Sequence, residues 1–166
     1  SRARYAIIVA GGRGLRMGTA VPKQFLLLDG QPVLYYSVRA FTRVFPDIRV
    51  ILVHAPGDEP FIAAVTGCFP GRQFTLATGG VTRFESVKNG LAAVPEDAVV
   101  FIHDGVRPLV SEALIARCEQ AALEHGNAIP ATELKESIRR IHGAGSVSED
   151  RTRYRAVQTP QTFLSG

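Results

Sequence analysis

The sequence has few residues of the kinds that build disulfide frameworks or zinc sites. Its only cysteines are Cys68 and Cys118, and its four histidines are scattered without the spacing of a zinc site. These counts argue against a disulfide-rich secreted domain and against a zinc protein. Because unpaired cysteines are typical of a reducing compartment, we expect a cytoplasmic protein.

Long apolar runs are also missing. No stretch approaches the roughly 18 residues of a membrane span, and residues 5–9 are too short for the apolar region of a signal peptide. No run of Lys and Arg with interleaved aromatic residues marks a nucleic-acid surface. We therefore expect neither a membrane nor a nucleic acid as a partner.

The composition that remains is that of a globular domain. The chain has 166 residues, of which 46% are hydrophobic and 20% charged. A single domain of this size hides roughly 70% of the surface of its unfolded chain. The formal net charge is +4, and a site for a nucleoside triphosphate and a phosphorylated substrate would account for several surplus cations.

The chain is organised around a glycine loop that follows its first strand. Residues 5–9 form a short apolar run rich in β-branched residues, typical of a buried parallel strand. Glycines without a Cβ let an anion approach backbone N–H groups closely, and the cations that follow can hold its charge. The loop and its cations are Ala10, Gly11, Gly12, Arg13, Gly14, Arg16 and Lys23.

Two familiar phosphate motifs fit this loop poorly. The dinucleotide pattern G-x-G-x-x-G is broken because Met17 stands where the third glycine should be and Gly18 comes one residue late. The Walker pattern is absent. The alternative is that this loop binds no ligand. It would then be an ordinary βα turn in which the glycines only allow the backbone to turn and the cations are solvated.

Strand and helix patterns alternate along the first three quarters of the chain, which predicts an α/β fold with a mostly parallel sheet. We expect strands at residues 5–9, 48–53, 74–77, 98–102 and 128–131, with helices after Pro32, around residues 60–65 and at residues 111–124. Ligands of such sheets bind at the carboxyl ends of the strands. Each candidate motif lies at such an end, which favours one shared site.

Two further loops carry candidate site residues. Gly80, Arg83 and Ser86 lie between the third strand and the next helix, where glycine backbone groups face a helix start. After the fourth strand comes Asp104, which could hold a ribose hydroxyl or a water on Mg²⁺, or could simply pair with Arg107. We interpret His103 as a buried strand-end histidine with its nitrogens satisfied, not as a catalyst.

The C-terminal part changes pattern. Residues 132–141 alternate in polarity, residues 143–145 are Gly-Ala-Gly, and residues 147–155 return with charges of both signs. This pattern predicts a projecting two-stranded β-arm at about residues 133–155 of a single domain, residues 1–166. An exposed ribbon is unstable alone, so a partner subunit is reasonable; a solvated hairpin is the alternative.

Four stretches together carry a family resemblance: AGGRGLRM followed by VPKQF, then TGGVTRFESV, HDGVRPLV and YRAVQTPQTF. In this order they resemble the sugar-phosphate nucleotidyltransferases, and most closely the 2-C-methyl-D-erythritol 4-phosphate cytidylyltransferases. The resemblance runs from about residue 5 to residue 163. It implies a Rossmann-like sheet flanked by helices, CTP and a polyol phosphate as substrates, Mg²⁺ as cofactor and a homodimer formed through the β-arm.

The resemblance also assigns residues to roles. It implies Arg16, Lys23 and Arg151 as catalytic, with Arg151 acting in the site of the second subunit. For the nucleotide it implies Ala10, Gly11, Gly12, Gly14, Gly80, Arg83, Ser86, Asp104 and Gly105, with Asp104 also at the metal. For the acceptor it implies Arg107, Ser137 and Thr159.

The sequence departs from the family pattern in three places. Val81 stands where many relatives carry Asp, and Gly105 where relatives often have Ala. Relatives also continue beyond residue 166 with an Asp and a Lys that complete the metal and substrate sites. We therefore expect that a C-terminal portion of the family domain is absent, which leaves the activity of this chain open.

The expected reaction transfers CMP from CTP to 2-C-methyl-D-erythritol 4-phosphate and releases pyrophosphate. Another polyol phosphate, such as ribitol 5-phosphate, would need nearly the same motifs. A nucleotide-binding protein without catalysis is a second alternative. The third is a nicotinamide-binding oxidoreductase with Asp29 as the ribose acid, although the cations Arg16 and Lys23 count against it.

Overall fold

The computed structural model describes residues 2–12, 20–95 and 97–166, and its centre is a six-stranded sheet of order β5-β4-β1-β6-β12-β7. Four neighbouring strands are parallel, which confirms the α/β prediction: β1 (Ala3–Ala10), β4 (Arg49–His54), β5 (Phe74–Thr78) and β6 (Ala98–Asp104). In chain order these parallel strands lie 3-2-1-4, the order of a Rossmann half. The order reverses between β1 and β6, where ligands of such sheets bind.

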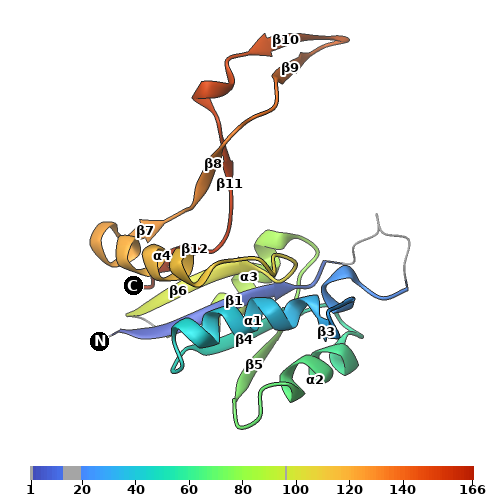
Figure 1. Ribbon diagram of the computed structural model, residues 1–166, viewed down its shortest axis with the longest axis vertical. Coiled ribbons are helices and arrows are strands. Elements are labelled where there is room, and N and C mark those ends of the chain that lie inside the picture. Colours follow the sequence, from blue (N-terminus) through green and yellow to red (C-terminus); the bar gives the residue numbers. More distant parts are fainter. Residues whose placement is uncertain (1, 13–19, 96) are drawn as a thin grey trace.

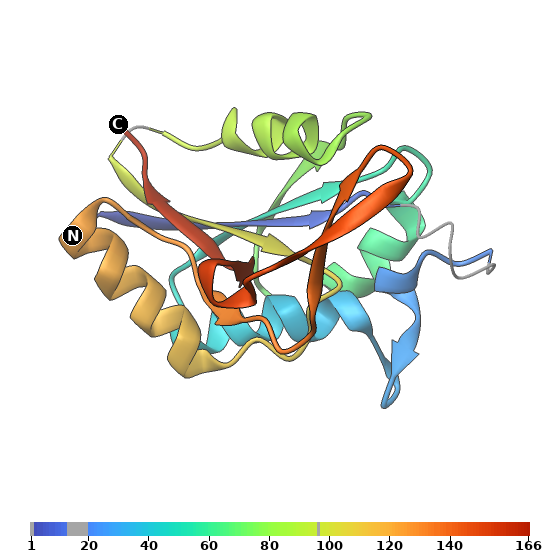
Figure 2. The same ribbon diagram turned by 90° about the horizontal axis from the view of Figure 1, so that it is seen from above.

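Helices cover both faces of the sheet (Figures 1 and 2). One face carries α1 (Val33–Val44), α2 (Glu59–Gly67) and α4 (Glu112–His125), and the other carries α3 (Arg83–Leu91). The side chains of β1 alternate between two cores, with Ile8 in the first and Ile7 in the second. This alternation is why a continuous apolar run is needed in each central strand.

The ends of α4 carry residues that are typical of helix termini, and its range agrees with the helix expected at residues 111–124. The Ser111 hydroxyl accepts a hydrogen bond from Leu114 N at 3.2 Å, and Gly126 ends the helix in the left-handed region with φ +89°. A turn at residues 29 and 30 joins the short strands β2 (Leu27–Leu28) and β3 (Gln31–Pro32). Among the described residues, no helix has the length and apolar character that a membrane crossing requires.

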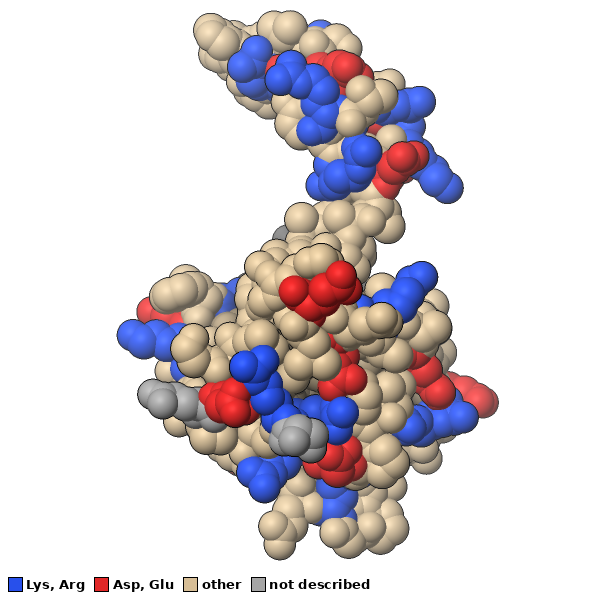
Figure 3. Space-filling model, turned by 90° about the vertical axis from the view of Figure 1, so that its left-hand side faces the viewer, with Lys and Arg blue, Asp and Glu red and all other residues tan. Residues whose placement is uncertain are grey.

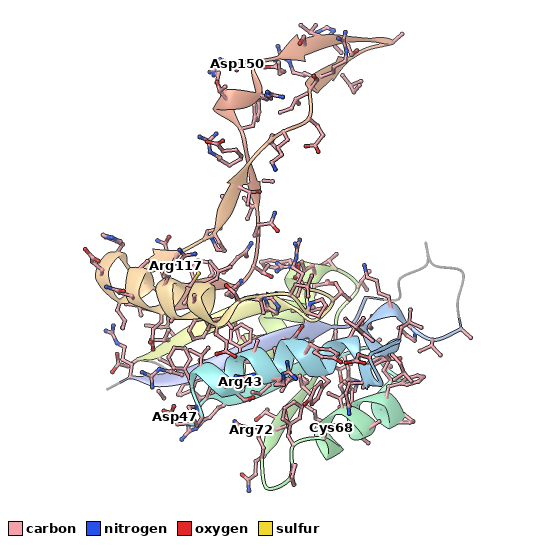
Figure 4. All side chains as sticks on the ribbon, in the orientation of Figure 1. Arg43, Asp47, Cys68, Arg72, Arg117 and Asp150 are labelled. Atoms are coloured by element: carbon pink, nitrogen blue, oxygen red, sulfur yellow. The ribbon has the colours of Figure 1, made fainter. Side chains whose placement is uncertain are left out.

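The β-arm projects far from the sheet (Figure 1). Its root pairs β8 (Ala131–Glu133) with β11 (Arg155–Val157), and its outer part pairs β9 (Ile138–His142) with β10 (Gly145–Glu149). A short 3-10 turn, η3 (Arg151–Arg153), lies between the two returning strands. Figure 4 shows Asp150 in this outer part, remote from the helices of the body.

Two strand predictions need correction near the arm. The strand expected at residues 128–131 is split, because β7 (Asn127–Ala128) ends before Pro130, which has no N–H for a ladder. The strand β12 (Gln161–Leu164) was not expected, and it lies antiparallel to both β6 and β7. It returns the chain from the arm to the sheet, between β6 and the edge strand β7.

Candidate active site

A pocket of about 280 Å³ lies at the carboxyl ends of the parallel strands, where the strand order reverses. It brings together predicted residues from three separate loops: Ala10, Gly11, Gly12, Lys23, Gly80, Arg83, Ser86 and Asp104. The predicted residues Gly14 and Arg16 lie outside the described residues. The alternative ribose acid, Asp29, lies in the β2–β3 turn and not among the residues that line this pocket.

Gln24, which the sequence analysis did not single out, holds the glycine loop. Its side chain is 1% exposed, and its Nε2 donates to the carbonyl oxygens of Ala10 at 2.6 Å and Gly12 at 3.0 Å. The neighbouring Phe25 stacks on Phe61 with ring centroids 4.9 Å apart. These contacts fix the short turn η2 (Lys23–Phe25), so that Lys23 lines the pocket beside the loop.

The loop before α3 is shaped by a capping box. Thr82 Oγ1 accepts from Glu85 N at 3.1 Å, and Glu85 Oε2 accepts from Thr82 N at 2.9 Å. A Cβ on Gly80 would lie 2.3 Å from the Cβ of Glu85, so this position requires glycine. The buried Ser86 hydroxyl accepts from Gly80 N at 3.0 Å and donates to the Thr82 carbonyl oxygen at 3.0 Å.

Val81, the departure in this loop, is 97% exposed and is among the residues that line the pocket. A position that works through its backbone tolerates valine. The exposed side chain is therefore compatible with a nucleotide loop, and it makes no contact that would replace a carboxylate.

Asp104 is held between two arginines. Its Oδ1 accepts from Nε and Nη2 of Arg83 at 3.1 and 3.0 Å, and its Oδ2 accepts from Nε of Arg107 at 3.1 Å. Burial would raise the pKa of the Asp104 carboxyl, but the hydrogen bonds and charges of Arg107 and Arg83 outweigh burial and hold that pKa below its usual value. The pairing with Arg107 is therefore confirmed, and Asp104 also lines the pocket.

The neighbouring Gly105 ties β6 to β1 and does not itself line the pocket. Its N–H donates to the Val9 carbonyl oxygen at 2.9 Å, and its carbonyl oxygen accepts from the Ser37 hydroxyl at 3.1 Å. A Cβ here would lie 2.8 Å from Cδ1 of Leu34, so the alanine of relatives would require Leu34 to shift.

The fit of the site to a divalent cation follows from the acceptors that remain free on Asp104. A carboxylate has about four acceptor positions, and the two arginines use three of those on Asp104. No cluster of three or more His, Cys, Asp or Glu that could hold a metal occurs in the described part of the chain. The residues therefore fit a divalent cation that substrate phosphates would mainly hold, with Asp104 as its contact on the protein.

The predicted acceptor residues fall in two separate places. Arg107 and Thr159 line a second hollow of about 330 Å³ beside the arm root, and Arg107 Nη1 donates to Gln158 Oε1 at 2.8 Å. Ser137 and Arg151 lie instead on the projecting arm, where Arg151 donates to the Lys135 carbonyl oxygen. Within one chain the arm extends away from the body (Figure 1), so these residues do not converge with Lys23.

His103 is buried, as expected. Desolvation by burial lowers the pKa of its imidazole to about 4, so the ring is neutral at pH 7. Its Nδ1 lies 2.9 Å from Thr159 Oγ1, and its Nε2 lies 3.1 Å from the Arg107 carbonyl oxygen. Both nitrogens are occupied, which confirms the interpretation of a satisfied strand-end histidine.

Comparison with known proteins gives a consistent result. A family model described as "2-C-methyl-D-erythritol 4-phosphate cytidylyltransferase" matches residues 5–165. A protein with the same description from Bacteroides thetaiotaomicron is 44% identical over 160 residues, which cover 95% of this chain and 72% of that protein. One from Bacteroides fragilis is 45% identical over 163 residues, covering 96% and 74%.

Solved structures are similar in fold. A crystal structure of 4-diphosphocytidyl-2C-methyl-D-erythritol synthase from Anaerococcus prevotii superposes with a TM-score of 0.82 at 30% identity, covering 98% of this chain and 70% of that one. The 2-C-methyl-D-erythritol 4-phosphate cytidylyltransferase of Thermus thermophilus gives a TM-score of 0.74 at 31% identity, covering 99% and 71%.

Proposed function

The chain belongs to the 2-C-methyl-D-erythritol 4-phosphate cytidylyltransferase family, and from that premise we propose how its own residues carry the reaction. The enzyme transfers a cytidylyl group from CTP to 2-C-methyl-D-erythritol 4-phosphate and releases pyrophosphate, a step of isoprenoid synthesis by the non-mevalonate pathway. The observation that carries the residue roles is the pocket in which the glycine loop, Lys23, Arg83 and Asp104 meet.

The chemistry requires charge stabilisation and not a general base. An oxygen of the acceptor phosphate, largely ionised near pH 7 because its second pKa is about 6, attacks the α-phosphorus of CTP. The new P–O bond forms as the bond to the β-phosphate bridging oxygen breaks, and pyrophosphate leaves with that electron pair. The imidazole of His103 takes no part, because both of its nitrogens are committed inside the protein.

We propose the following roles for the pocket residues. Backbone N–H groups of Gly11 and Gly12 bind the triphosphate, and Lys23 stabilises the charge that develops on it. Gly80, Arg83 and Ser86 hold the base and ribose, and Arg107 binds the acceptor phosphate in the hollow that Thr159 also lines. Arg16 and Gly14, which lie outside the described residues, would serve the same triphosphate.

Mg²⁺ is the proposed cofactor, and Asp104 would hold it together with the substrate phosphates. When bound, the ion supplies charge neutralisation across the phosphates. The arginines on Asp104 keep its carboxylate ionised, and they leave one acceptor position on Oδ2 for that contact.

We further propose a single domain that works as a homodimer in the cytoplasm. Cys68 and Cys118 are both free thiols, as a reducing compartment permits. The arm carries six basic and four acidic residues between positions 133 and 155 (Figure 3), and it exposes Ile141 and Val147 on its outer strands. A second subunit would cover these apolar side chains and receive Ser137 and Arg151 into its acceptor site.

Pyrophosphate release tests the function directly. CTP with 2-C-methyl-D-erythritol 4-phosphate should give pyrophosphate, whereas ribitol 5-phosphate as acceptor should give much less. UTP and ATP in place of CTP test the base choice at a loop that carries Val81. Binding of CTP without any release would support the non-catalytic alternative, and preference for ribitol 5-phosphate would reassign the acceptor.

Lys23→Ala tests the triphosphate site. It should lower kcat by about 10²-fold or more if Lys23 stabilises charge in the transition state. The matched control is Lys88→Ala on α3, an exposed lysine that does not line the pocket. Turnover of Lys23→Ala close to that of Lys88→Ala would reject the assigned role.

A further inference from the structure

His103 lies next to Asp104 and contacts the backbone carbonyl of Arg107 and the side-chain hydroxyl of Thr159. It is the last buried side chain of β6, 0% exposed, and its ring packs on Phe41 with centroids 5.3 Å apart. Its Nε2 contacts the carbonyl oxygen of Arg107, four residues further along the chain. Its Nδ1 contacts Thr159, which lies 56 residues away, next to the root of the arm.

The direction of each hydrogen bond follows from the partners. The Arg107 carbonyl can only accept, so Nε2 of the imidazole carries the proton. In the neutral ring Nδ1 is then an acceptor, and the Thr159 hydroxyl donates to it at 2.9 Å. The same hydroxyl oxygen accepts from Asp104 N–H at 3.3 Å. Asp104, Thr159, His103 and Arg107 thus form one directed chain.

This chain of hydrogen bonds determines which partners the Thr159 hydroxyl can bind. Its side chain is 7% exposed, and its single hydroxyl proton is directed inward to the imidazole. The hydroxyl is therefore not free to donate to a substrate phosphate. What it holds instead is the amide of Asp104, the residue whose carboxylate joins Arg83 to Arg107.

The turn between Asp104 and Arg107 is closed by the bond from Arg107 N to the Asp104 carbonyl oxygen at 3.0 Å. Its two ends are the ones that the His103 chain reaches, Asp104 through Thr159 and Arg107 directly. The Arg107 guanidinium extends from this turn and donates to two oxygens, Oδ2 of Asp104 and Oε1 of Gln158. A displacement of the turn would therefore move the Arg107 guanidinium within the hollow that is proposed to bind the acceptor.

We propose that His103 is a positioning residue of the acceptor site: with Thr159 as its relay, it sets the Asp104–Arg107 turn and so aims the Arg107 guanidinium. This rests on the proposed function, in which Arg107 binds the acceptor phosphate. A histidine that merely filled space against Phe41 could be replaced by another aromatic ring. A positioning histidine could not, because its hydrogen bonds carry the effect.

Three substitutions of His103 separate these roles. His103→Phe keeps an aromatic ring against Phe41 and removes both hydrogen bonds. His103→Asn is designed to keep an acceptor for Thr159, and His103→Gln to keep a donor for the Arg107 carbonyl. His125→Gln, at the exposed end of α4, is the matched control, with kinetics expected to equal those of the wild type.

For His103→Phe we expect the KM for 2-C-methyl-D-erythritol 4-phosphate to rise about tenfold or more, the scale of losing hydrogen bonds at a charged contact. The KM for CTP should stay within about twofold of the wild-type value, because the hydrogen bonds through His103 do not reach the glycine loop. His103→Asn and His103→Gln should each recover part of the loss, and Thr159→Ser should retain more acceptor affinity than Thr159→Val.

A double variant distinguishes positioning from stability. His103→Phe leaves the Thr159 hydroxyl without its acceptor, and adding Thr159→Val removes that group. The double variant should regain part of the Tm lost in His103→Phe while its acceptor KM remains raised. Recovery of the acceptor KM together with the Tm would overturn the proposal, as would a normal acceptor KM in His103→Phe.

One readout does not require turnover. In the wild type, hydrogen exchange of the Asp104 amide and of Arg107 Nε–H, followed by NMR, should be slow, and it should accelerate at least about tenfold in His103→Phe. Unchanged exchange at both groups would overturn the proposal. Failure of this chain and of a version extended at its C-terminus to release pyrophosphate would refute the proposed function, and exchange would still decide whether His103 holds the turn.

Discussion

At the scale of single residues, Gln24 gives the clearest example of a role that the sequence did not reveal. Its two N–H groups each serve one carbonyl of the glycine loop, whereas its Oε1 has no hydrogen-bond partner among the described residues. Gln24 therefore supports the glycine loop as a hydrogen-bond donor and not as an acceptor. The sequence places Gln24 next to Lys23 in VPKQF, but nothing in that spacing says that its amide reaches back 12 and 14 residues.

Gln24→Met tests this donation, because methionine has similar length and no N–H. The carbonyls of Ala10 and Gly12 would lose their hydrogen-bond donor, which costs about 1–3 kcal/mol of stability per buried group. The N–H groups of the glycine loop would then no longer be held in the orientation that binds the triphosphate. We expect kcat/KM for CTP to fall about 10- to 100-fold in a steady-state assay. Gln31→Met, at a glutamine that contacts Cys68 outside the pocket, should leave it unchanged.

The titration of His103 predicts a pH dependence of stability. Burial lowers the pKa of its imidazole in the folded chain to about 4, from 6.5 when unfolded. The unfolded chain therefore binds more protons between these values. The contribution of the neutral His103 to the free energy of unfolding is therefore complete above pH 6.5. It is lost as the pH falls towards 4, by up to about 3 kcal/mol in total.

Urea unfolding of the wild type and of His103→Asn at pH 4.5 to 7.5 measures this contribution. The difference in free energy of unfolding between the two proteins should shrink as the pH falls, because asparagine does not titrate. A difference that stays constant across this range would contradict the neutral buried imidazole. Asp104 contributes in the same direction at lower pH, since its depressed pKa means that stability is lost only as its carboxylate becomes protonated.

At the scale of elements, the capping box of α3 serves both stability and the site. Thr82 begins a helix whose first turn carries Arg83 and whose next turn carries Ser86, both in the pocket wall. Thr82→Ala should cost about 1 kcal/mol, or a few degrees in Tm by calorimetry. It should also raise the KM for CTP severalfold, because the helix start that orients Gly80 and Arg83 frays.

Ser111→Ala is the matched control for that experiment. Ser111 caps α4 by the same kind of bond, from Leu114 N to its hydroxyl at 3.2 Å, and does not line the pocket. It should lose a similar amount of stability and leave the KM for CTP unchanged. Equal effects of both substitutions on the KM would mean that the cap of α3 has no special relation to the nucleotide.

Elements with strong periodicity could be predicted, and those made by long-range pairing could not. The central strands and α4 followed from apolar runs, a cap and a terminal glycine, all local signals. By contrast, β12 is four residues long and gains its hydrogen bonds from β6 and β7, so its own sequence gives no clear pattern. The split at Pro130 had a local signal in the missing N–H of proline.

The candidate site divides in the same way. Gly80 and Asp104 were found because glycine before a helix and acid after a strand are visible locally. His103 and Gln158 act through contacts with residues 51 to 56 positions away, which no spacing in the sequence displays. The order of the parallel strands brings these distant segments together.

At the scale of the whole molecule, the proposed homodimer would divide the proposed site between two chains. Lys23 belongs to the body, whereas Arg151 lies on an arm that extends away from it (Figure 1). If a symmetric dimer places the arm of one subunit over the acceptor side of the other, each complete site needs residues from both. Deletion of residues 133–155 should then give a monomer by light scattering, with CTP binding preserved in the body.

Complementation between two inactive variants tests this division most directly. Arg151→Ala should weaken acceptor use and spare CTP binding, because the planar guanidinium suits bidentate contact with phosphate and the triphosphate site lies in the body. Arg151→Lys should rescue it only in part, since a point charge lacks that fork. Lys23→Ala should be inactive for the separate reason of lost charge at the triphosphate.

In a mixed dimer, the subunit with Arg151→Ala keeps Lys23 and receives an intact arm from its partner, so one site of the two is complete. Random exchange of subunits makes about half of the dimers mixed, so recovery should approach one quarter of wild-type turnover. Mass spectrometry of the exchanged sample verifies that mixed dimers have formed. If verified mixed dimers of these two variants stay inactive, Arg151 serves the site of its own chain or has no part in catalysis.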